Sequence, residues 1–145
     1  MGIERLEPLI GEWTLEVDIP GSEGVAATTR FAWILGGAFV QESSEVDHPA
    51  APDGVCIISA NADGDGAFTQ HYFDERGVVR VYEMRFDGRD WELLRVKADF
   101  TPLDFSQRYT GRLSDDGKRI DGRWESSNDG QSWDLDFRLN YLRLA

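Results

Sequence analysis

The stretch "RYTGRLSDDGKRIDGRWESSNDGQSWDLDF", residues 108–137, contains Asp-Gly pairs at residues 116–117 and 129–130 that separate three runs of alternating side chains. Asp-Gly is favoured in two-residue hairpin turns, because both central residues of such a turn need a positive φ. A turn at Asp116-Gly117 predicts that Tyr109 pairs with Trp124 and that both side chains lie on one face of a sheet. The same register sets Gly111 opposite Gly122 and Leu113 opposite Ile120.

The Asp-Gly pair at residues 129–130 extends this hairpin into a meander. A turn at Asp129-Gly130 predicts that Trp124 pairs with Leu135, and by the same register Ser126 with Trp133 and Gly122 with Phe137. The two turns independently place the side chains of Tyr109, Trp124, Leu135 and Phe137 on one face. This agreement favours antiparallel strands throughout the stretch.

Alternation with a period of two continues along the rest of the chain. It is clear in "WTLEVDI" (residues 13–19) and "WDLDFRLNYLR" (residues 133–143), and turn signals occur at residues 36–37, 63–66, 74–77 and 87–88. This spacing predicts about ten strands. Only "IERLEPLI" suggests a short helix, at the N-terminus. We therefore expect one all-β domain over residues 1–145, a closed or nearly closed up-and-down antiparallel barrel with a short N-terminal helix.

The composition limits the partners of the protein. The net charge is −12, which argues against nucleic acid and anionic membrane surfaces as partners, since both need clustered Lys and Arg. The first residues are charged from Glu4 onward, so we expect neither a signal peptide nor a transmembrane helix and a cytoplasmic location. Cys56 is the single cysteine and can form no intrachain disulfide. The oligomeric state is left open.

Residues near both ends carry a resemblance to a known superfamily. "GEW" (Gly11 to Trp13) follows the predicted helix, and Arg143 lies in the last strand in "NYLRL". A Gly-x-Trp near the start that is covered by an arginine from the end resembles the calycins, the superfamily of lipocalins and fatty-acid-binding proteins. The resemblance implies a barrel in which the Arg143 guanidinium lies over the Trp13 indole, a cation–π contact.

"LIGEW" followed by "FAWILGGAFVQES" is similar to a family of uncharacterised bacterial lipocalin-like domains and, more distantly, to the haem-binding nitrobindins. Nitrobindin-like proteins hold haem through a histidine late in the barrel, and this chain has only His48 and His71. His48 lies in a Pro-rich connection. A loop with a glycine bulge at Gly77 would pair Tyr72 with Arg80 and turn His71 outward, whereas a tighter turn would place His71 inside. We expect no haem and no other cofactor.

Charged residues also fall on the predicted inner face. A two-residue turn at Asp87-Gly88 pairs Arg80 with Arg95, and it likewise pairs Met84 with Trp91 and Tyr82 with Leu93. Two like charges directly opposite are destabilising unless an anion or a carboxylate neutralises them. The turn at Gly36-Gly37 aligns Phe31 with Glu42, which makes Glu42 the candidate carboxylate. The arginines then either lie at a rim, in water or paired with Glu42, or bind an anion.

The favoured function is a binding protein for a small apolar or amphipathic molecule, with a carboxylate as one option for its polar group. Arg80-x-Tyr82 resembles the Arg-x-Tyr with which fatty-acid-binding proteins hold a carboxylate. The predicted ligand-binding residues are Arg80, Tyr82, Arg95, Glu42, Trp33, Tyr109, Trp124 and Trp133.

Two alternatives remain open. One is an isomerase- or lyase-type enzyme on the same barrel, with Glu42 or His71 as the base and Arg80 or Tyr82 as the electrophile. The other is a protein-interaction module. The sequence contains no recognisable catalytic motif. Asn61, Asp63, Asp65 and Gly66 imitate the start of an EF-hand loop, but the twelfth residue of that loop is Tyr72 where calcium needs a Glu, so we expect no metal site.

Overall fold

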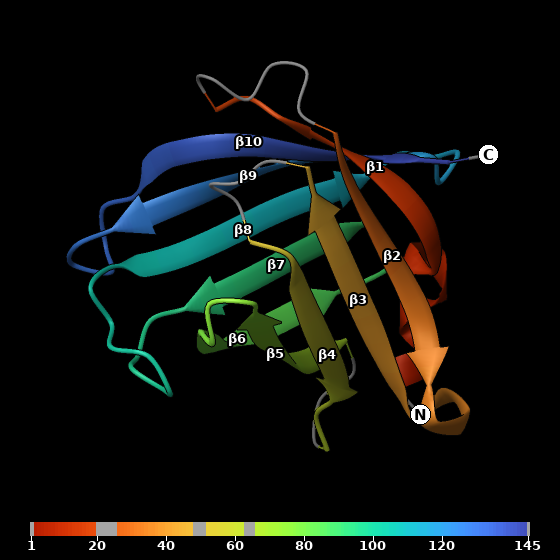
Figure 1. Ribbon diagram of the computed structural model, residues 1–145, viewed down its shortest axis with the longest axis horizontal. Coiled ribbons are helices and arrows are strands. Elements are labelled where there is room, and N and C mark those ends of the chain that lie inside the picture. The colour runs from red at the N-terminus through yellow and green to blue at the C-terminus, as the bar shows by residue number, and fades with distance from the viewer. Residues whose placement is uncertain (1, 20–25, 48–51, 63–65, 145) are drawn as a thin grey trace.

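The chain forms a closed antiparallel barrel in which each strand pairs with its neighbours in sequence and β1 pairs with β10 (Figure 1). The computed structural model describes residues 2–19, 26–47, 52–62 and 66–144. The prediction of an all-β barrel with a short N-terminal helix is confirmed. The elements are the 3₁₀ helix η1 (Ile3–Leu9), β1 (Gly11–Val17), β2 (Ala27–Ile34), the 3₁₀ turn η2 (Leu35–Gly37), β3 (Phe39–Val46), β4 (Gly54–Ala60), β5 (Ala67–Asp74), β6 (Val79–Phe86), β7 (Asp90–Arg95), β8 (Ser106–Leu113), β9 (Arg119–Ser127) and β10 (Asp134–Arg143).

The β8–β9 hairpin has the predicted register. Tyr109 pairs with Trp124, Gly111 with Gly122 and Leu113 with Ile120. The two glycines leave room for the Tyr109 side chain, because a Cβ at Gly122 would overlap its hydroxyl group. Tyr109 is thereby held inside the barrel, where its hydroxyl donates a hydrogen bond to the Leu139 carbonyl oxygen (3.1 Å).

The β9–β10 connection is longer than the predicted two-residue turn. The Asp129 carboxylate accepts hydrogen bonds from the backbone N–H groups of Gln131 and Ser132, both at 2.8 Å, and so stabilises a wider loop over residues 128–133. The register therefore shifts, and a bulge between Leu135 and Phe137 shifts it once more. The predicted pairs of Trp124 with Leu135, Ser126 with Trp133 and Gly122 with Phe137 are wrong. Phe137 is the residue that pairs with Trp124.

The β6–β7 turn differs from its prediction for the same physical reason. The Asp87 carboxylate accepts hydrogen bonds from the N–H groups of Arg89 (2.9 Å) and Asp90 (2.7 Å), which favours a four-residue loop. The first pair is then Phe86 with Trp91, and the predicted pairs of Met84 with Trp91, Tyr82 with Leu93 and Arg80 with Arg95 are wrong. Because the register moves by two residues, every side chain keeps its predicted face.

One end of the barrel is closed by η1, next to the β2–β3 turn (Figure 1). Leu6 and Leu9 of η1 are fully buried. The predicted contact between Arg143 and Trp13 is confirmed, since the guanidinium carbon lies 4.1 Å from the ring centroid and the two residues are paired across β1 and β10. The opposite end, where residues 96–105 and 128–133 connect strands, is called the open end below.

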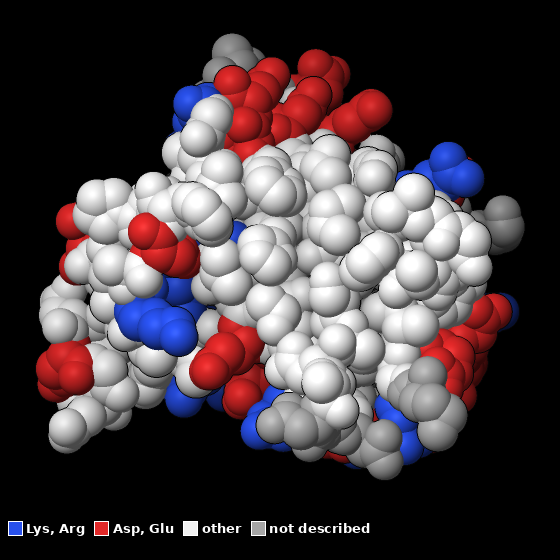
Figure 2. Space-filling model, turned by 90° about the horizontal axis from the view of Figure 1, so that it is seen from below, with Lys and Arg blue, Asp and Glu red and all other residues white. Residues whose placement is uncertain are grey.

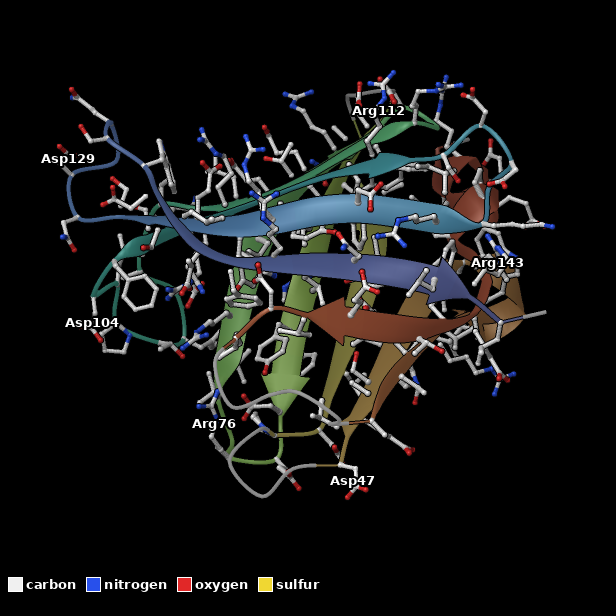
Figure 3. All side chains as sticks on the ribbon, turned by 90° about the horizontal axis from the view of Figure 1, so that it is seen from above. Asp47, Arg76, Asp104, Arg112, Asp129 and Arg143 are labelled. Carbon is white, nitrogen blue, oxygen red and sulfur yellow. The ribbon has the colours of Figure 1, made fainter. Side chains whose placement is uncertain are left out.

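The two outer faces of the barrel differ in charge. On the face shown in Figure 2, the middle carries no acidic or basic side chains, in line with the outward residues Val55, Ile57 and Thr69 of β4 and β5. The opposite face, over β8, β9 and β10, carries cross-strand ion pairs such as Arg108–Glu125 and Arg112–Asp90 (Figure 3). No helix among the described residues has the length and apolar character needed to cross a membrane.

Candidate functional site

Four chemically distinctive side chains form one row on the inner face of the barrel. Glu42 pairs with Cys56, Cys56 with Tyr72, and Tyr72 with Arg80, so the row crosses β3, β4, β5 and β6. The predicted pairs of Phe31 with Glu42 and of Tyr72 with Arg80 are confirmed. Neighbouring strands lie about 4.8 Å apart, so Glu42 and Arg80 are separated by about 14 Å along the sheet.

His71 pairs with Val81 and faces outward, as the longer turn at Gly77 predicts. His48, Asp63 and Asp65 lie outside the described residues. Among the residues that are described, no cluster of three or more His, Cys, Asp or Glu side chains could hold a metal ion.

Glu42 is a buried carboxyl group, with only 7% of the residue exposed. Burial raises its pKa from 4.5 to about 7, and the hydrogen bond with Thr29 acts in the opposite direction. The Glu42 charge also adds to the effect of burial in raising the pKa of Tyr109 and of Tyr141, which places both phenols near the carboxyl. In the described parts of the chain, Glu42 has no ion pair with an arginine.

The hydrogen bonds around Thr29 fit the neutral form of Glu42. The Thr29 hydroxyl oxygen lies 3.0 Å from Glu42 Oε2, 3.1 Å from the Ser43 carbonyl oxygen and 2.7 Å from the Ser44 hydroxyl. A hydroxyl group has one proton to donate and two lone pairs. All three contacts are hydrogen bonds at once if Thr29 shares its proton between Glu42 and Ser43, or if it donates to Ser43 and accepts from Ser44 and from a protonated Glu42.

Arg95 faces inward, as predicted, but its partner is Asp99 and not Glu42. The Arg95 side chain is 3% exposed, and its Nε and Nη2 atoms donate to the two Asp99 carboxylate oxygens at 2.9 and 3.0 Å. This pairing holds the pKa of Asp99 well below its usual range. Nη2 also donates to the Thr101 carbonyl oxygen (2.7 Å). Arg95 is therefore neutralised by the protein itself.

Arg80 is the inward arginine without such a partner. It forms no ion pair with any carboxylate in the described residues, and its Nε atom is buried without a hydrogen-bond acceptor. Burial raises the pKa of the neighbouring Tyr82, while the charge and hydrogen bond of Arg80 act in the opposite direction. The Tyr82 hydroxyl in turn donates to Gln107 Oε1 at 3.0 Å.

Gln70 adds an unpartnered acceptor beside this arginine. It is 3% exposed, and its Oε1 atom has no hydrogen-bond partner among the described residues. Gln70 pairs with Tyr82 and lies diagonally across β5 and β6 from Arg80. A buried donor and a buried acceptor thus occur side by side, and buried polar groups of this kind are normally satisfied by a water molecule or a ligand.

Aromatic rings lie next to these polar groups. The Trp124 ring centroid lies 5.8 Å from that of Tyr82 and 5.3 Å from that of Tyr109. Arg80, Tyr82, Arg95, Tyr109 and Trp124 are therefore brought together in the half of the barrel toward the open end. With Glu42 at the far end of its row, they form the candidate site.

The two remaining predicted site residues lie elsewhere. Trp33 is near the closed end, where its Nε1 donates to Glu7 Oε2 of η1 at 3.1 Å. Trp133 lies in the β9–β10 loop with the Arg108 guanidinium 4.4 Å above its ring, on the outer surface. The prediction that Trp133 faces inward is wrong, because Trp133 belongs to the loop that Asp129 stabilises and not to β10, which begins at Asp134.

Several residues of the site were not predicted. Alternation could have identified Gln70 and Cys56, because they share the inward parity of Tyr72 and Glu42. Thr29 has the parity of Phe31 and could have been found in the same way. No sequence signal pointed to Asp99, which lies outside the strands.

A hollow of about 350 Å³ lies elsewhere on the molecule, beside the β6–β7 turn, where Arg85, Glu92 and Thr110 contribute to its wall. This region is at the end of β6 away from Arg80. None of the predicted site residues contributes to the hollow, and we assign it no role.

Comparison with known proteins gives a match to the fold. No protein-family model matches the chain, and no curated protein sequence matches it. Among solved structures, Rv2717c from M. tuberculosis is similar, with a TM-score of 0.64 and 14% sequence identity over 99% of this chain and 97% of that chain. At this identity the match concerns the fold alone. The match supports the closed ten-stranded antiparallel barrel as the fold of this chain.

Proposed function

We propose that the protein binds a small amphipathic molecule in the half of the barrel toward the open end, with a carboxylate of the ligand at Arg80. The observation that carries this proposal is the inward Arg80 guanidinium, which has a buried, unpartnered Nε and no carboxylate among the described residues. A buried guanidinium is costly unless an anion or hydrogen-bond acceptors satisfy it. Arg95 has Asp99 for this purpose, whereas Arg80 has no equivalent.

The surroundings of Arg80 support an amphipathic ligand over a purely polar one. Tyr82, Trp124 and Tyr109 form a continuous aromatic surface next to the guanidinium. Such surfaces stabilise an apolar chain or ring, while a few polar groups orient the molecule. Gln70 Oε1 could then accept a hydrogen bond from a water molecule or from the polar end of the ligand.

The binding of a carboxylate can be tested with a matched pair of compounds. Dodecanoate and dodecanol have the same apolar chain and differ in the charge of the head group. Calorimetric titration is expected to show binding of dodecanoate and weaker binding of dodecanol. Native mass spectrometry of the purified protein would identify any molecule that is retained from the cell. Equal affinities for the two compounds would contradict the role of Arg80, and binding of neither, nor of any retained molecule, would contradict the proposal as a whole.

The substitution Arg80→Ala is expected to weaken dodecanoate binding by about 1–3 kcal/mol, roughly fivefold to 150-fold, because a charge-assisted hydrogen bond is lost. The stability of the ligand-free protein should be unchanged or higher, since a half-buried charge without an ion-pair partner among the described residues is removed. Calorimetric titration and urea unfolding measure the two effects. Arg85→Ala, on the outward face of the same strand, is the control. A strong loss of stability in Arg80→Ala would instead indicate a structural role for the arginine.

A second function is favoured by Glu42. A buried carboxyl with a pKa of about 7 is suited to accept and return a proton near neutral pH. In an isomerase- or lyase-type reaction, Glu42 would take a proton from carbon, and the nearby Tyr109 or Tyr141 would polarise the neighbouring carbonyl group, because Arg80 is about 14 Å away along the sheet. Incubation with 2-oxooctanoate in D₂O should then exchange the hydrogens at C3, and Glu42→Gln should abolish the exchange. No exchange above the rate in buffer would count against catalysis and leave the binding function unaffected.

A further inference from the structure

The barrel wall is incompletely paired next to Arg80. Strand β6 begins at Val79, but its pairing with β7 runs only from Glu83, opposite Leu94, to Phe86, opposite Trp91. The first residues of β6, from Val79 to Tyr82, therefore have β5 on one side and no strand on the other. Arg80 and Tyr82 of the candidate site lie in this part of β6.

The loop of residues 96–105, between β7 and β8, takes the place of the missing strand. The Asp99 carboxylate accepts a hydrogen bond from the Val81 N–H (2.8 Å), and the Thr101 hydroxyl donates to the Val79 carbonyl oxygen (2.8 Å). Both contacts are made by side chains of the loop. They are fewer than the backbone hydrogen bonds of a paired strand and are easier to break. Figure 3 labels Asp104 of this loop, which lies at the same end of the barrel as Asp129 of the β9–β10 loop.

Arg95 fastens this loop from inside the barrel. Its guanidinium donates to both oxygens of Asp99 and to the Thr101 carbonyl oxygen, so the two residues that reach β6 are held by the same side chain. The loop exposes large apolar side chains beside its charged ones, because Val96 is 44%, Phe100 74% and Phe105 37% exposed. A loop with few apolar contacts to the barrel opens at a lower free energy than the paired strands.

We propose that the gap between β6 and β7 is the entrance for the ligand and that residues 96–105 are its lid, with the Arg95–Asp99 ion pair as the latch. This inference rests on the proposed function, since it assigns the route to the site beside Arg80. Separation of the latch removes the hydrogen bond at Val81 and exposes Arg95, whose charge attracts the acid group of the incoming molecule. The exposed phenylalanines offer a first contact for the apolar chain.

The latch is tested by Asp99→Asn, which keeps the shape of the side chain and removes its charge. Stopped-flow fluorescence with cis-parinarate, a fluorescent polyene fatty acid, measures uptake. The association rate constant is expected to rise about tenfold, with a smaller change in the dissociation constant because release is accelerated as well. Asp104→Asn, which makes the same charge change at an exposed position of the loop, should leave both rates unchanged.

The methyl ester of cis-parinarate separates opening of the lid from simple electrostatic attraction. A lid that opens more often admits the neutral ester faster as well, whereas a freed arginine accelerates only the acid. Acceleration of the acid alone would therefore overturn the inference. Thr101→Val, which removes only the hydrogen bond to Val79, serves as a milder second variant in case Asp99→Asn folds poorly, and it should give a smaller acceleration in the same direction.

Amide hydrogen exchange reports on the lid without any ligand. In Asp99→Asn the Val81 amide should exchange at least tenfold faster, while the amide of Met84, in the paired part of β6, should be unaffected. Faster exchange at Val81 with unchanged uptake of acid and ester would show that this gap is not the entrance, and the proposed function would stand. If the wild-type protein and all variants bind neither probe, the proposed function itself fails.

Discussion

Replacement of Glu42 by glutamine is expected to stabilise the protein more at pH 8 than at pH 4. The difference in the free energy of unfolding between the variant and the wild type should be about 3 kcal/mol larger at pH 8. Glutamine resembles the protonated acid in shape, and its amide N–H can donate to Thr29 as the neutral carboxyl does. The variant thus keeps the form of residue 42 that fits the interior and cannot ionise. Urea unfolding of both proteins across this pH range measures the difference.

The sign follows from the two pKa values of Glu42. Its pKa is about 7 in the folded protein and 4.5 when the chain is unfolded and exposed to water. Below pH 4.5 the group is protonated in both states, and the stability that depends on it is fully present. Between pH 4.5 and 7 only the unfolded chain loses the proton, so the stability of the wild type falls as the pH rises. At about 1.4 kcal/mol per pH unit, this interval amounts to about 3 kcal/mol.

Glu45→Gln is the matched control, because Glu45 lies on the same strand and is exposed. Its effect on stability should be small and should not vary with pH over this range. If the effect of Glu42→Gln were equally independent of pH, Glu42 would have to be ionised with an ordinary pKa, and the hydrogen bonds assigned to Thr29 would be wrong. The catalytic alternative would then lose its proton acceptor.

The faces of the strands could be predicted from the sequence more reliably than their register. Alternation placed Arg80, Tyr82 and Arg95 inside the barrel, and they remain there although the β6–β7 register moves by two residues. The Asp-Gly pairs at residues 87–88, 116–117 and 129–130 located three of the turns correctly. The lengths of two turns depend on how the carboxylates of Asp87 and Asp129 bond to the following N–H groups, which the dipeptide alone does not determine.

The partners of the inward charges were the least predictable part of the site. Glu42 was expected to neutralise the arginines because it shares their face, but it lies at the far end of the row from Arg80. Asp99 fulfils this role for Arg95 from a loop, where no periodicity indicates the direction of a side chain. As a result, one arginine is paired within the protein and the other is left for a ligand, a distinction that only the three-dimensional arrangement reveals.

Removal of the Arg143 side chain is expected to lower the free energy of unfolding by about as much as Glu42→Gln raises it at pH 8, but independently of pH. Its guanidinium lies over Trp13 and donates hydrogen bonds to the carbonyl oxygens of Gly117 (3.0 Å), Ile10 (2.7 Å) and Pro8 (2.5 Å). These contacts join the last strand to the end of η1 and to the β8–β9 turn. Arg143→Ala leaves the carbonyl groups without their donor and should cost about 3 kcal/mol in the free energy of unfolding.

Two further variants separate the planar guanidinium from its charge. Arg143→Lys keeps the charge but offers no fork of donors for several carbonyl groups, so it should restore only a part of the lost stability. Arg138→Ala is the control on the same strand, because Arg138 is exposed and lies 3.8 Å from Asp18 in a surface ion pair. It should change the stability by less than about 0.5 kcal/mol. An equally mild effect of Arg143→Ala would mean that η1 is held by its apolar contacts alone.

Gly11 provides an independent check of this arrangement, because it faces the same guanidinium. Its φ is +130°, and a Cβ there would lie 2.7 Å from Arg143 Nη1, so alanine at this position is opposed both by the backbone and by the arginine. Gly11→Ala should therefore be strongly destabilising in the wild type and less so in Arg143→Ala, where only the backbone term remains. A double-mutant cycle measured by urea unfolding should give a coupling energy of about 1 kcal/mol or more. Strict additivity would show that the arginine moves aside without cost, and the glycine of the Gly-x-Trp motif would then be required by its backbone conformation alone.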